Sequence, residues 1–419
     1  MLDFRPPLDS PLLIRFVKLC LPAYMRFGLH DTRVVPVDGA VERFKKLGGK
    51  RALICPNHAN RHDPMTMFTF SRLAGEDFNF IAAREVFDWD NGLNGWWLQH
   101  LGCYSVVRGA ADRESFKTTK RLLCEGKKKL VLFPEGEISR QNDTLMPLES
   151  GAAQMTFWAL DELVKQNKDA PIPDMVVVPM ALKYTYADDV KPALSHTLRE
   201  LEARLAIKPE GGEEALYPRL RKVAETLLAT LESEYDVKPA AGATLNERVV
   251  ALRSFILQNV ARQLNCEIQS GARQLESVRI LRNAMDDFIY SDDHDGSDYQ
   301  RKIHDEKAAV VRGLYNDLNR VVNFIAIYDG YLSENLTQER FSDILDRLET
   351  EIMRHREPSF RGARRVLVDV GKPVDMTKLY KDYKKDKRAT TQKVTDQLFA
   401  EMSRMLVELD KHRHPLLVG

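Results

Sequence analysis

A histidine and an aspartate five residues apart form the most reactive arrangement in the sequence. His58 follows the apolar run 51–56, and Asp63 comes just before a helical pattern. A five-residue offset does not stack two side chains on one helix face, so it suits a loop histidine and an aspartate in the first helical turn. A carboxylate on one ring nitrogen fixes the tautomer and leaves the other nitrogen to accept a proton. Such a pair can act as a general base, typically worth roughly 10²–10⁴-fold in rate.

Two other interpretations of this segment stay open on spacing alone. The histidine could simply hydrogen-bond to an aspartate that caps a helix, with no chemistry. His62 is also a rival base, because it lies next to Asp63. The choice therefore depends on polar residues elsewhere in the chain.

Further polar residues follow two other apolar runs. Arg108 comes after the run 103–107, and Glu135 and Gly136 come after 129–133. Sites in α/β sheets form just outside the carboxyl ends of the strands, so these side chains would meet His58 if the strands are parallel neighbours. An arginine can bind a phosphate with two nitrogens. A glycine lets the backbone approach a ligand closely, and the glutamate could orient an arginine or accept a hydrogen bond from a substrate hydroxyl.

Four blocks in this order resemble the glycerolipid acyltransferases of the lysophosphatidate (1-acylglycerol-3-phosphate) acyltransferase type. The blocks are Asn57-His58 with Asp63 (the HX4D motif), Gly102–Gly109, Phe133-Pro134-Glu135-Gly136, and Val176-Val177-Val178-Pro179. The resemblance covers about residues 10–187, and a shorter stretch near 364–376. It implies that His58 is the catalytic base, that Asp63 orients it, that Arg108 contacts phosphate, and that Glu135 and Gly136 belong to the acceptor site.

The resemblance also implies the reaction and its substrates. The donor would be an acyl thioester on coenzyme A or acyl carrier protein, and no bound cofactor or metal is expected. The acceptor would be a lysophospholipid hydroxyl, in the first instance 1-acylglycerol 3-phosphate, which would give phosphatidate in phospholipid biosynthesis. The implied partners are thus the thioester donor and a membrane lipid surface.

One departure from the family pattern leaves the acceptor open. The family usually continues its third block with Thr, Arg and Ser, whereas this chain has Glu137, Ile138 and Ser139. Ile138 replaces an arginine that often binds phosphate, and Glu137 would repel one. Arg140, two residues later, could substitute. Glycerol 3-phosphate, another lysolipid or an amine-bearing lipid therefore remain alternative acceptors, and a non-catalytic membrane-bound scaffold is a further alternative.

Composition limits the remaining possibilities. The chain has 419 residues, of which 44% are apolar and 29% charged, as expected of a globular protein with a full core. A formal net charge of +1 argues against a nucleic-acid-binding polycation. The five cysteines include no CxxC pair, which indicates a reducing compartment and no zinc site.

The pattern of apolar residues predicts an α/β fold with a mixed, mostly parallel sheet flanked by helices. Strands are expected at 51–56, 103–107, 129–133, 175–179 and 365–370, because these runs are short and rich in Val, Leu and Ile. Helices are expected at 111–125 and 151–166. Trp96 and Trp97 are interpreted as an aromatic core pair, with the lining of an acyl cavity as the alternative.

A change of pattern predicts the domain organisation. Residues 188–361 repeat apolar residues every three to four positions, so a long all-helical insertion should separate an acyltransferase domain at 30–187 from a returning strand and C-terminal helix at 362–419. No transmembrane helix is evident. The sequence does not indicate an oligomeric state.

Residues 1–29 are expected to hold an amphipathic membrane-surface helix. Arg15, Lys18 and Arg26 fall on one side of an otherwise apolar helical stretch, and Pro22 should kink it. A cationic stripe of this kind suits an anionic membrane surface, and the alternative is a helix packed on the domain. We therefore expect a cytoplasmic protein, peripheral on the inner face of a membrane.

Overall fold

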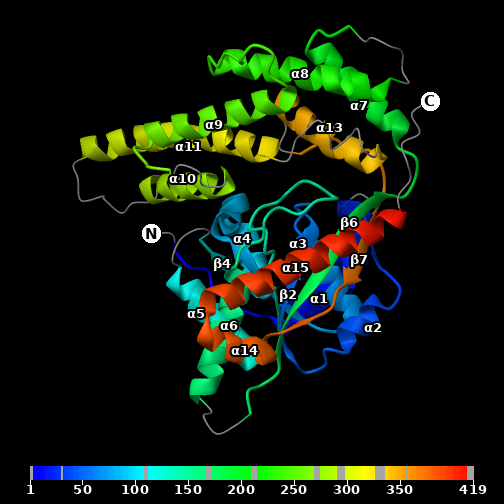
Figure 1. Cartoon of the computed structure of the whole chain (residues 1–419), viewed down its shortest axis with the longest axis vertical. Coiled ribbons are helices and arrows are strands. Elements are labelled where there is room, and N and C mark those ends of the chain that lie inside the picture. Colours follow the sequence, from blue (N-terminus) through cyan, green and yellow to red (C-terminus); the bar gives the residue numbers. More distant parts are fainter. Residues whose placement is uncertain are drawn as a thin grey trace.

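The computed structural model places a sheet with flanking helices below a layer of helices (Figure 1). It describes residues 3–29, 32–107, 112–166, 171–208, 215–268, 274–289, 298–325, 336–354 and 357–412. Among these residues, no helix is long and apolar enough to cross a membrane.

One mixed sheet forms the centre of the α/β part. Its strands are β1 (Arg33–Pro36), β2 (Arg51–Pro56), β3 (Phe78–Ala83), β4 (Cys103–Val106), β5 (Lys129–Val131), β6 (Met175–Tyr186), β7 (Arg364–Val370) and β8 (Val374–Asp375). The order is β1-β7-β6-β2-β5-β3-β4, and β8 pairs with β6. Strands β6, β2, β5, β3 and β4 run parallel, whereas β7 and β8 run antiparallel to β6. The predicted fold class is confirmed.

Two details of the sheet differ from the sequence prediction. The strand β3 was not predicted, and it lies between β5 and β4, so the strand before Arg108 is an edge strand and not a neighbour of β5. The strand β6 is also much longer than the expected run 175–179, and all of it is buried. Only its last four residues, 183–186, alternate polar and aromatic side chains, and β7 and the helices cover this part.

Helices cover both faces of this sheet. They are α1 (Pro11–Ala23) with a π-helical turn (Tyr24–Gly28), α2 (Ala40–Lys45), α3 (Asp63–Ala74), a 3-10 segment (Arg84–Gly92), α4 (Leu93–His100), α5 (Arg113–Glu125), α6 (Gly151–Gln166), α14 (Met376–Lys385), α15 (Lys387–Leu409) and a last turn (Asp410–His412). One core joins the sheet to α1, α2 and α3, and a second joins it to α5, α6, α14 and α15. The α/β part is therefore a three-layer sandwich.

The first helix packs on the sandwich by one face only. Ile14 and Leu21, a full two turns apart, are each 1% exposed. Lys18 lies toward this side, because its Nζ donates to Asp77 at 2.6 Å. The predicted cationic stripe is therefore divided, with Lys18 bound to the domain while Arg15 and Arg26 are exposed. Pro22 lies inside the helix, and the turn that follows is π-helical.

The prediction of a tryptophan core pair is wrong. Trp96 and Trp97 are 47% and 38% exposed and contact each other edge-to-face. They lie on α4, which packs through Leu98 and Leu101 instead. An adjacent aromatic pair on a short helix points to two different sides, so both rings cannot be buried against one core.

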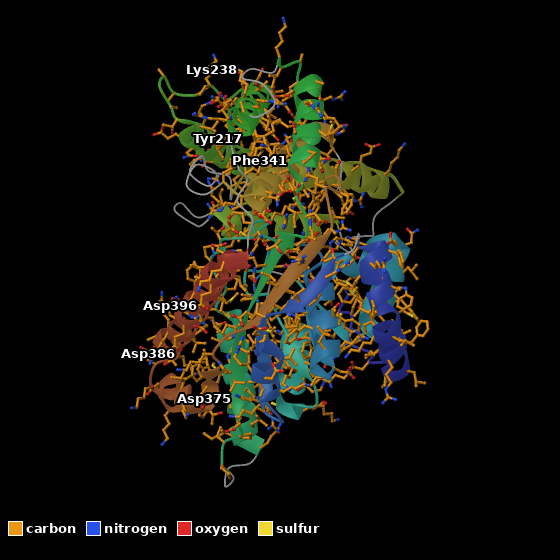
Figure 2. The ribbon with its side chains drawn as sticks, turned by 90° about the vertical axis from the view of Figure 1, so that its right-hand side faces the viewer. Tyr217, Lys238, Phe341, Asp375, Asp386 and Asp396 are labelled. Carbon is orange, nitrogen blue, oxygen red and sulfur yellow. The ribbon has the colours of Figure 1, made fainter. Side chains whose placement is uncertain are left out.

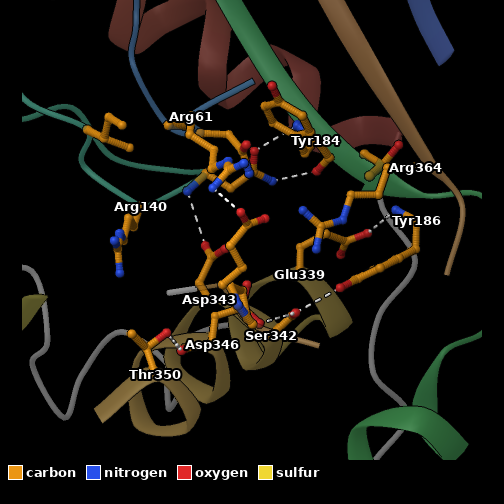
Figure 3. A pocket seen from close by; sticks show the side chains of 17 residues that line it. Arg61, Arg140, Tyr184, Tyr186, Glu339, Ser342, Asp343, Asp346, Thr350 and Arg364 are labelled. Atoms are coloured by element: carbon orange, nitrogen blue, oxygen red, sulfur yellow. Dashed lines mark hydrogen bonds and ion pairs between the residues drawn. The ribbon is translucent and has the colours of Figure 1, made fainter. Parts of the chain in front are cut away.

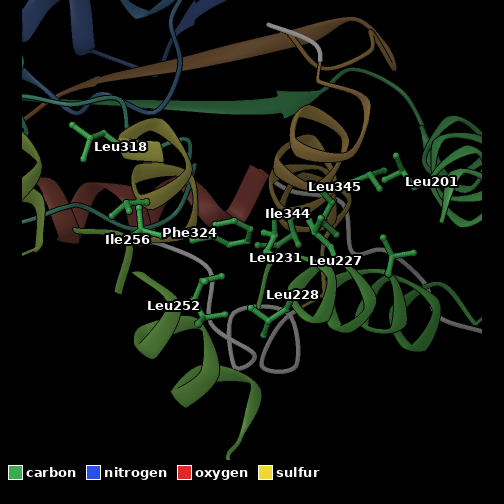
Figure 4. Packing of buried hydrophobic residues seen from close by; sticks show 14 of the residues in the cluster. Leu201, Leu227, Leu228, Leu231, Leu252, Ile256, Leu318, Phe324, Ile344 and Leu345 are labelled. Atoms are coloured by element: carbon green, nitrogen blue, oxygen red, sulfur yellow. The ribbon is translucent and has the colours of Figure 1, made fainter. Parts of the chain in front are cut away.

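The helices between β6 and β7 form a separate layer with its own core, called the insertion below. They are α7 (Lys191–Arg204), α8 (Leu216–Glu234), α9 (Leu245–Gln263), α10 (Gln274–Ile289), α11 (Asp298–Ile325) and α13 (Gln338–Met353). Leucines three to four residues apart on α8, such as Leu227 and Leu231, pack against Leu345 of α13 in this core (Figure 4). The layer lies at one end of the sandwich, with α10 and α13 nearest to it (Figure 1).

Candidate active site

The side chain of His58 lies in the loop between β2 and α3. Its Nδ1 is 2.9 Å from Oδ2 of Asp63, the first residue of α3. The ring stacks on Phe133 with centroids 4.2 Å apart. The preceding residue fixes the start of the loop, because the Asn57 amide exchanges two hydrogen bonds with the backbone of Leu182 in β6. The ring of His58 and the backbone at the start of its loop are therefore both fixed by neighbouring groups.

The Asp63 carboxylate is fully buried and surrounded by donors. Oδ1 accepts a hydrogen bond from the Tyr184 hydroxyl at 2.6 Å, and Oδ2 also accepts one from the Asn60 amide at 2.8 Å. Burial, together with the charge of Asp63, raises the pKa of Tyr184 well above its usual range, so the tyrosine remains a donor. A carboxylate held in this way orients Nδ1–H of His58 and leaves Nε2 as the proton acceptor.

His62 does not offer the same arrangement. Burial, followed by the charge of Arg61, lowers the pKa of His62 to about 4. Its ring accepts a hydrogen bond from Arg61 at 3.3 Å, and within the described chain no carboxylate bonds to it. A histidine of such low basicity, without an orienting carboxylate, is a poor general base at neutral pH.

Glu135 holds the backbone of His58 in place. Its buried carboxylate accepts hydrogen bonds from the His58 amide at 2.5 Å and from the Met146 amide at 2.8 Å. Both carboxylate oxygens therefore accept hydrogen bonds from backbone amides. Burial raises the pKa of Glu135 to about 7, against the two amides that lower it.

Gly136 makes room for the insertion. Its φ of +69° favours glycine, and a Cβ at this position would lie 2.6 Å from Nη2 of Arg279 in α10. The close approach expected at this glycine is thus made by an arginine of the same chain. Glu137, next to it, is paired with Arg282 of α10 at 2.6 Å, so its negative charge is offset.

The loop 57–62 between β2 and α3, which carries His58, is called the base loop below. A small cavity of about 120 Å³ lies beside it, between α13 and the carboxyl end of β6 (Figure 3). Arg61, Ile138, Arg140 and Arg364 line it, together with acidic side chains of α13. Arg140 has a φ of +51°, and its guanidinium makes no hydrogen bond to another side chain among the described residues. Arg108 lies outside the described residues.

Several residues of this site were not identified from the sequence. Three side chains from distant parts of the chain contact this site. Tyr184 binds Asp63, Arg279 binds the Glu135 carbonyl, and Arg282 binds Glu137. No periodicity or spacing connects them to the motifs, because their contacts arise only when β6 and α10 are brought to the base loop. The alternation of polar and apolar residues in 183–186 was the only signal for Tyr184.

Residues 30–183 match the family model described as Acyltransferase. This stretch is similar to an acyltransferase domain, and it spans less than half of the chain. No curated protein matches the chain. The acyltransferase match ends inside β6, so β7, β8, the insertion and the C-terminal helices lie beyond it, although β7 completes the same sheet.

The raised pKa of Glu135 predicts a pH dependence of stability. A carboxyl whose folded pKa is about 7 rather than 4.5 contributes stability that is fully present below pH 4.5 and is lost as the pH rises through about 7. The full loss is about 3 kcal/mol. Urea unfolding should therefore show that the protein gains stability, relative to a Glu135→Gln variant, between pH 8 and pH 5.

The variant serves as its own control, because its amide does not titrate. Any fixed cost of replacing an acceptor oxygen by an N–H group is the same at both pH values. A difference in unfolding free energy that stays constant from pH 8 to pH 5 would contradict the prediction.

Proposed function

We propose that the protein is an O-acyltransferase that moves a fatty acyl group from an acyl thioester to a lysophospholipid hydroxyl, namely that of 1-acylglycerol 3-phosphate, giving phosphatidate. The observation that carries the proposal is the pair of His58 and buried Asp63 inside an acyltransferase domain. The donor is acyl coenzyme A or acyl-acyl carrier protein.

The proposed chemistry is direct transfer. The acceptor hydroxyl gives its proton to Nε2 of His58 while its oxygen attacks the thioester carbonyl, and a C–O bond forms. The C–S bond then breaks, and the departing thiolate takes the proton back from the imidazolium. Asp63 stabilises the imidazolium in between and holds the ring in place. The hydrogen bond from the His58 amide to the Glu135 carboxylate fixes the backbone that carries the base.

Two observations support a phosphate-bearing acceptor despite Ile138. Glu137 is paired with Arg282, so it no longer presents an uncompensated charge that would repel phosphate. Arg140 lines the cavity beside the base loop and could supply the contact that the family's arginine makes. Ile138 lines the same cavity and favours the alternative acceptors, which are glycerol 3-phosphate, another lysolipid or an amine-bearing lipid.

The exposed side of α1 supports a location on a membrane surface. Leu12, Phe16, Leu19 and Phe27 are between 59% and 80% exposed, beside the exposed Arg15 and Arg26. Such a face suits the boundary between acyl chains and anionic headgroups on the cytoplasmic side. The helix, in dark blue, runs along the edge of the sandwich opposite the labelled Asp375, Asp386 and Asp396 (Figure 2).

The exposed tryptophans continue this surface. The amide of Ser10, which caps α1, donates to the His100 carbonyl at the end of α4. The 3-10 segment and α4 carry four exposed apolar residues, Trp89, Leu93, Trp96 and Trp97. Tryptophan is the residue that prefers the interface between lipid and water. We therefore propose that α1 and α4 rest on the lipid from which the acceptor comes.

The proposed mechanism predicts that His58→Ala abolishes acyl transfer in a folded protein, because no other group accepts the proton. Thiol release from acyl coenzyme A in the presence of the acceptor should fall by roughly 10²-fold or more. His62→Ala is the matched control and should retain most of the activity. An active His58→Ala protein would overturn the mechanism, and a wild-type protein that releases no thiol from either donor would favour the scaffold alternative.

The acceptor is tested by comparing 1-acylglycerol 3-phosphate with glycerol 3-phosphate, other lysolipids and amine-bearing lipids. We expect the highest kcat/KM with 1-acylglycerol 3-phosphate. Arg140→Ala should raise KM for phosphate-bearing acceptors by about tenfold or more, the value of a hydrogen bond to a charged group. The exposed Arg312→Ala on α11 is the control. Faster transfer to an acceptor without a phosphate monoester would contradict this assignment.

Membrane binding is tested with vesicles that contain anionic phospholipid. Replacing Phe16, Leu19 and Phe27 together by serine removes apolar area that the lipid would cover, so binding should weaken by at least about tenfold. The control replaces exposed apolar residues of other surfaces, Val250, Val310 and Val407. Equal sedimentation of both triple variants with vesicles would exclude α1 as the contact.

A further inference from the structure

The segment between β5 and α6, residues 132–150, is a long connection without helix or strand. It nevertheless carries the buried Glu135 that fixes the backbone of His58. Long irregular connections are normally adaptable unless side chains hold them. The segment, called the FPEG loop below, makes a few contacts within itself, such as the Glu149 amide to the Pro134 carbonyl at 2.7 Å.

Arg279 of α10 joins the two ends of the FPEG loop. Its Nη2 donates to the Glu135 carbonyl at 2.9 Å, and its Nη1 is paired with the carboxylate of Glu149. The arginine is only 9% exposed, and Gly136 leaves the space that its guanidinium occupies. A planar guanidinium with fixed donor directions sets the separation of the two groups that it binds. Arg279 therefore fixes the loop at the residue that braces the base.

Arg347 of α13 holds the middle of the FPEG loop. Its Nη2 donates to the carbonyls of Ser139 and Arg140 at 2.9 and 2.8 Å, and the side chain is 2% exposed. The Ser139 amide in turn donates to the His58 carbonyl at 2.8 Å. The insertion thus reaches the backbone of His58 by a second route, through one intervening residue.

Further contacts of the insertion extend along the same loop. Arg282 pairs with Glu137, and Arg340 pairs with Asp143. Asp143 is also 3.5 Å from the buried Lys183 of β6. Buried charged groups and carbonyls are destabilised when they lose a hydrogen-bond partner, so the loop conformation depends on these arginines.

We propose that the insertion positions the catalytic base. Arg279 and Arg347 are the positioning residues, because they fix the position of Glu135 relative to the backbone of His58. The inference rests on the proposed acyl transfer. Both arginines donate to carbonyls of the FPEG loop, so each acts on His58 through that loop. Since small displacements of a catalytic group cost up to roughly 10²-fold in rate, loss of either arginine should lower kcat.

The kinetic test uses Arg279→Ala, Arg279→Lys and Arg347→Ala in the full chain. We expect kcat to fall by about tenfold or more in the alanine variants while KM for the thioester changes little. The lysine variant, which can keep one of the two contacts, should recover part of kcat. The matched control is Arg219→Ala, because Arg219 is an equally buried insertion arginine that forms a double hydrogen bond with Glu202, away from the loop.

Hydrogen exchange supplies a readout that does not depend on activity. The His58 and Met146 amides, both bound by Glu135, should exchange faster in Arg279→Ala and Arg279→Lys than in wild type and in Arg219→Ala. The lysine variant keeps the charge and serves as the test if the alanine variant does not fold.

Two results would overturn the positioning role. One is an equal loss of kcat in Arg219→Ala, and the other is unchanged exchange at both amides when Arg279 is replaced. A failure of the proposed function has a different signature, because wild type would then transfer no acyl group while the exchange at these amides still responded to Arg279.

Discussion

A buried carboxylate with two backbone partners is the constraint on which the site depends. Glu135 takes the amide of His58 on one oxygen and that of Met146 on the other, so it joins the base loop to the FPEG loop. A carboxylate removed from water must find donors in the protein, and the pairing of the two loops supplies them. The backbone position of His58 is therefore set by a buried carboxylate of another loop.

The sheet makes this pairing possible. The strands β2 and β5 are parallel neighbours, so the loops that leave their carboxyl ends start side by side. The long β6 lies on the other side of β2 and brings the backbone of Leu182 to Asn57 and the hydroxyl of Tyr184 to Asp63. The base loop is thus held from both neighbouring strands, which leaves the imidazole few alternatives to the orientation observed.

The insertion supplies charged partners to the FPEG loop. An acidic residue after the FPEG block would be costly when buried, and Arg282 of α10 compensates it. The glycine of the block admits Arg279 from the same helix. The FPEG loop and the insertion therefore belong together physically, because each supplies partners to the other. The apolar face of α1 lies on a different side of the molecule and remains open (Figure 2).

The sequence by itself determined the α/β class, the helical insertion, and the loop position of His58 with Asp63 at the start of a helix. These follow from local period and from residues close along the chain, which the sequence displays directly. It did not reveal β3, the full length of β6 or the exposure of Trp96 and Trp97, since burial of such segments depends on what packs over them. Only the tertiary structure decided that Glu135 holds the backbone of His58 and that Tyr184 and Arg279 support the two loops, because contacts between residues 77 to 144 positions apart leave no mark in spacing.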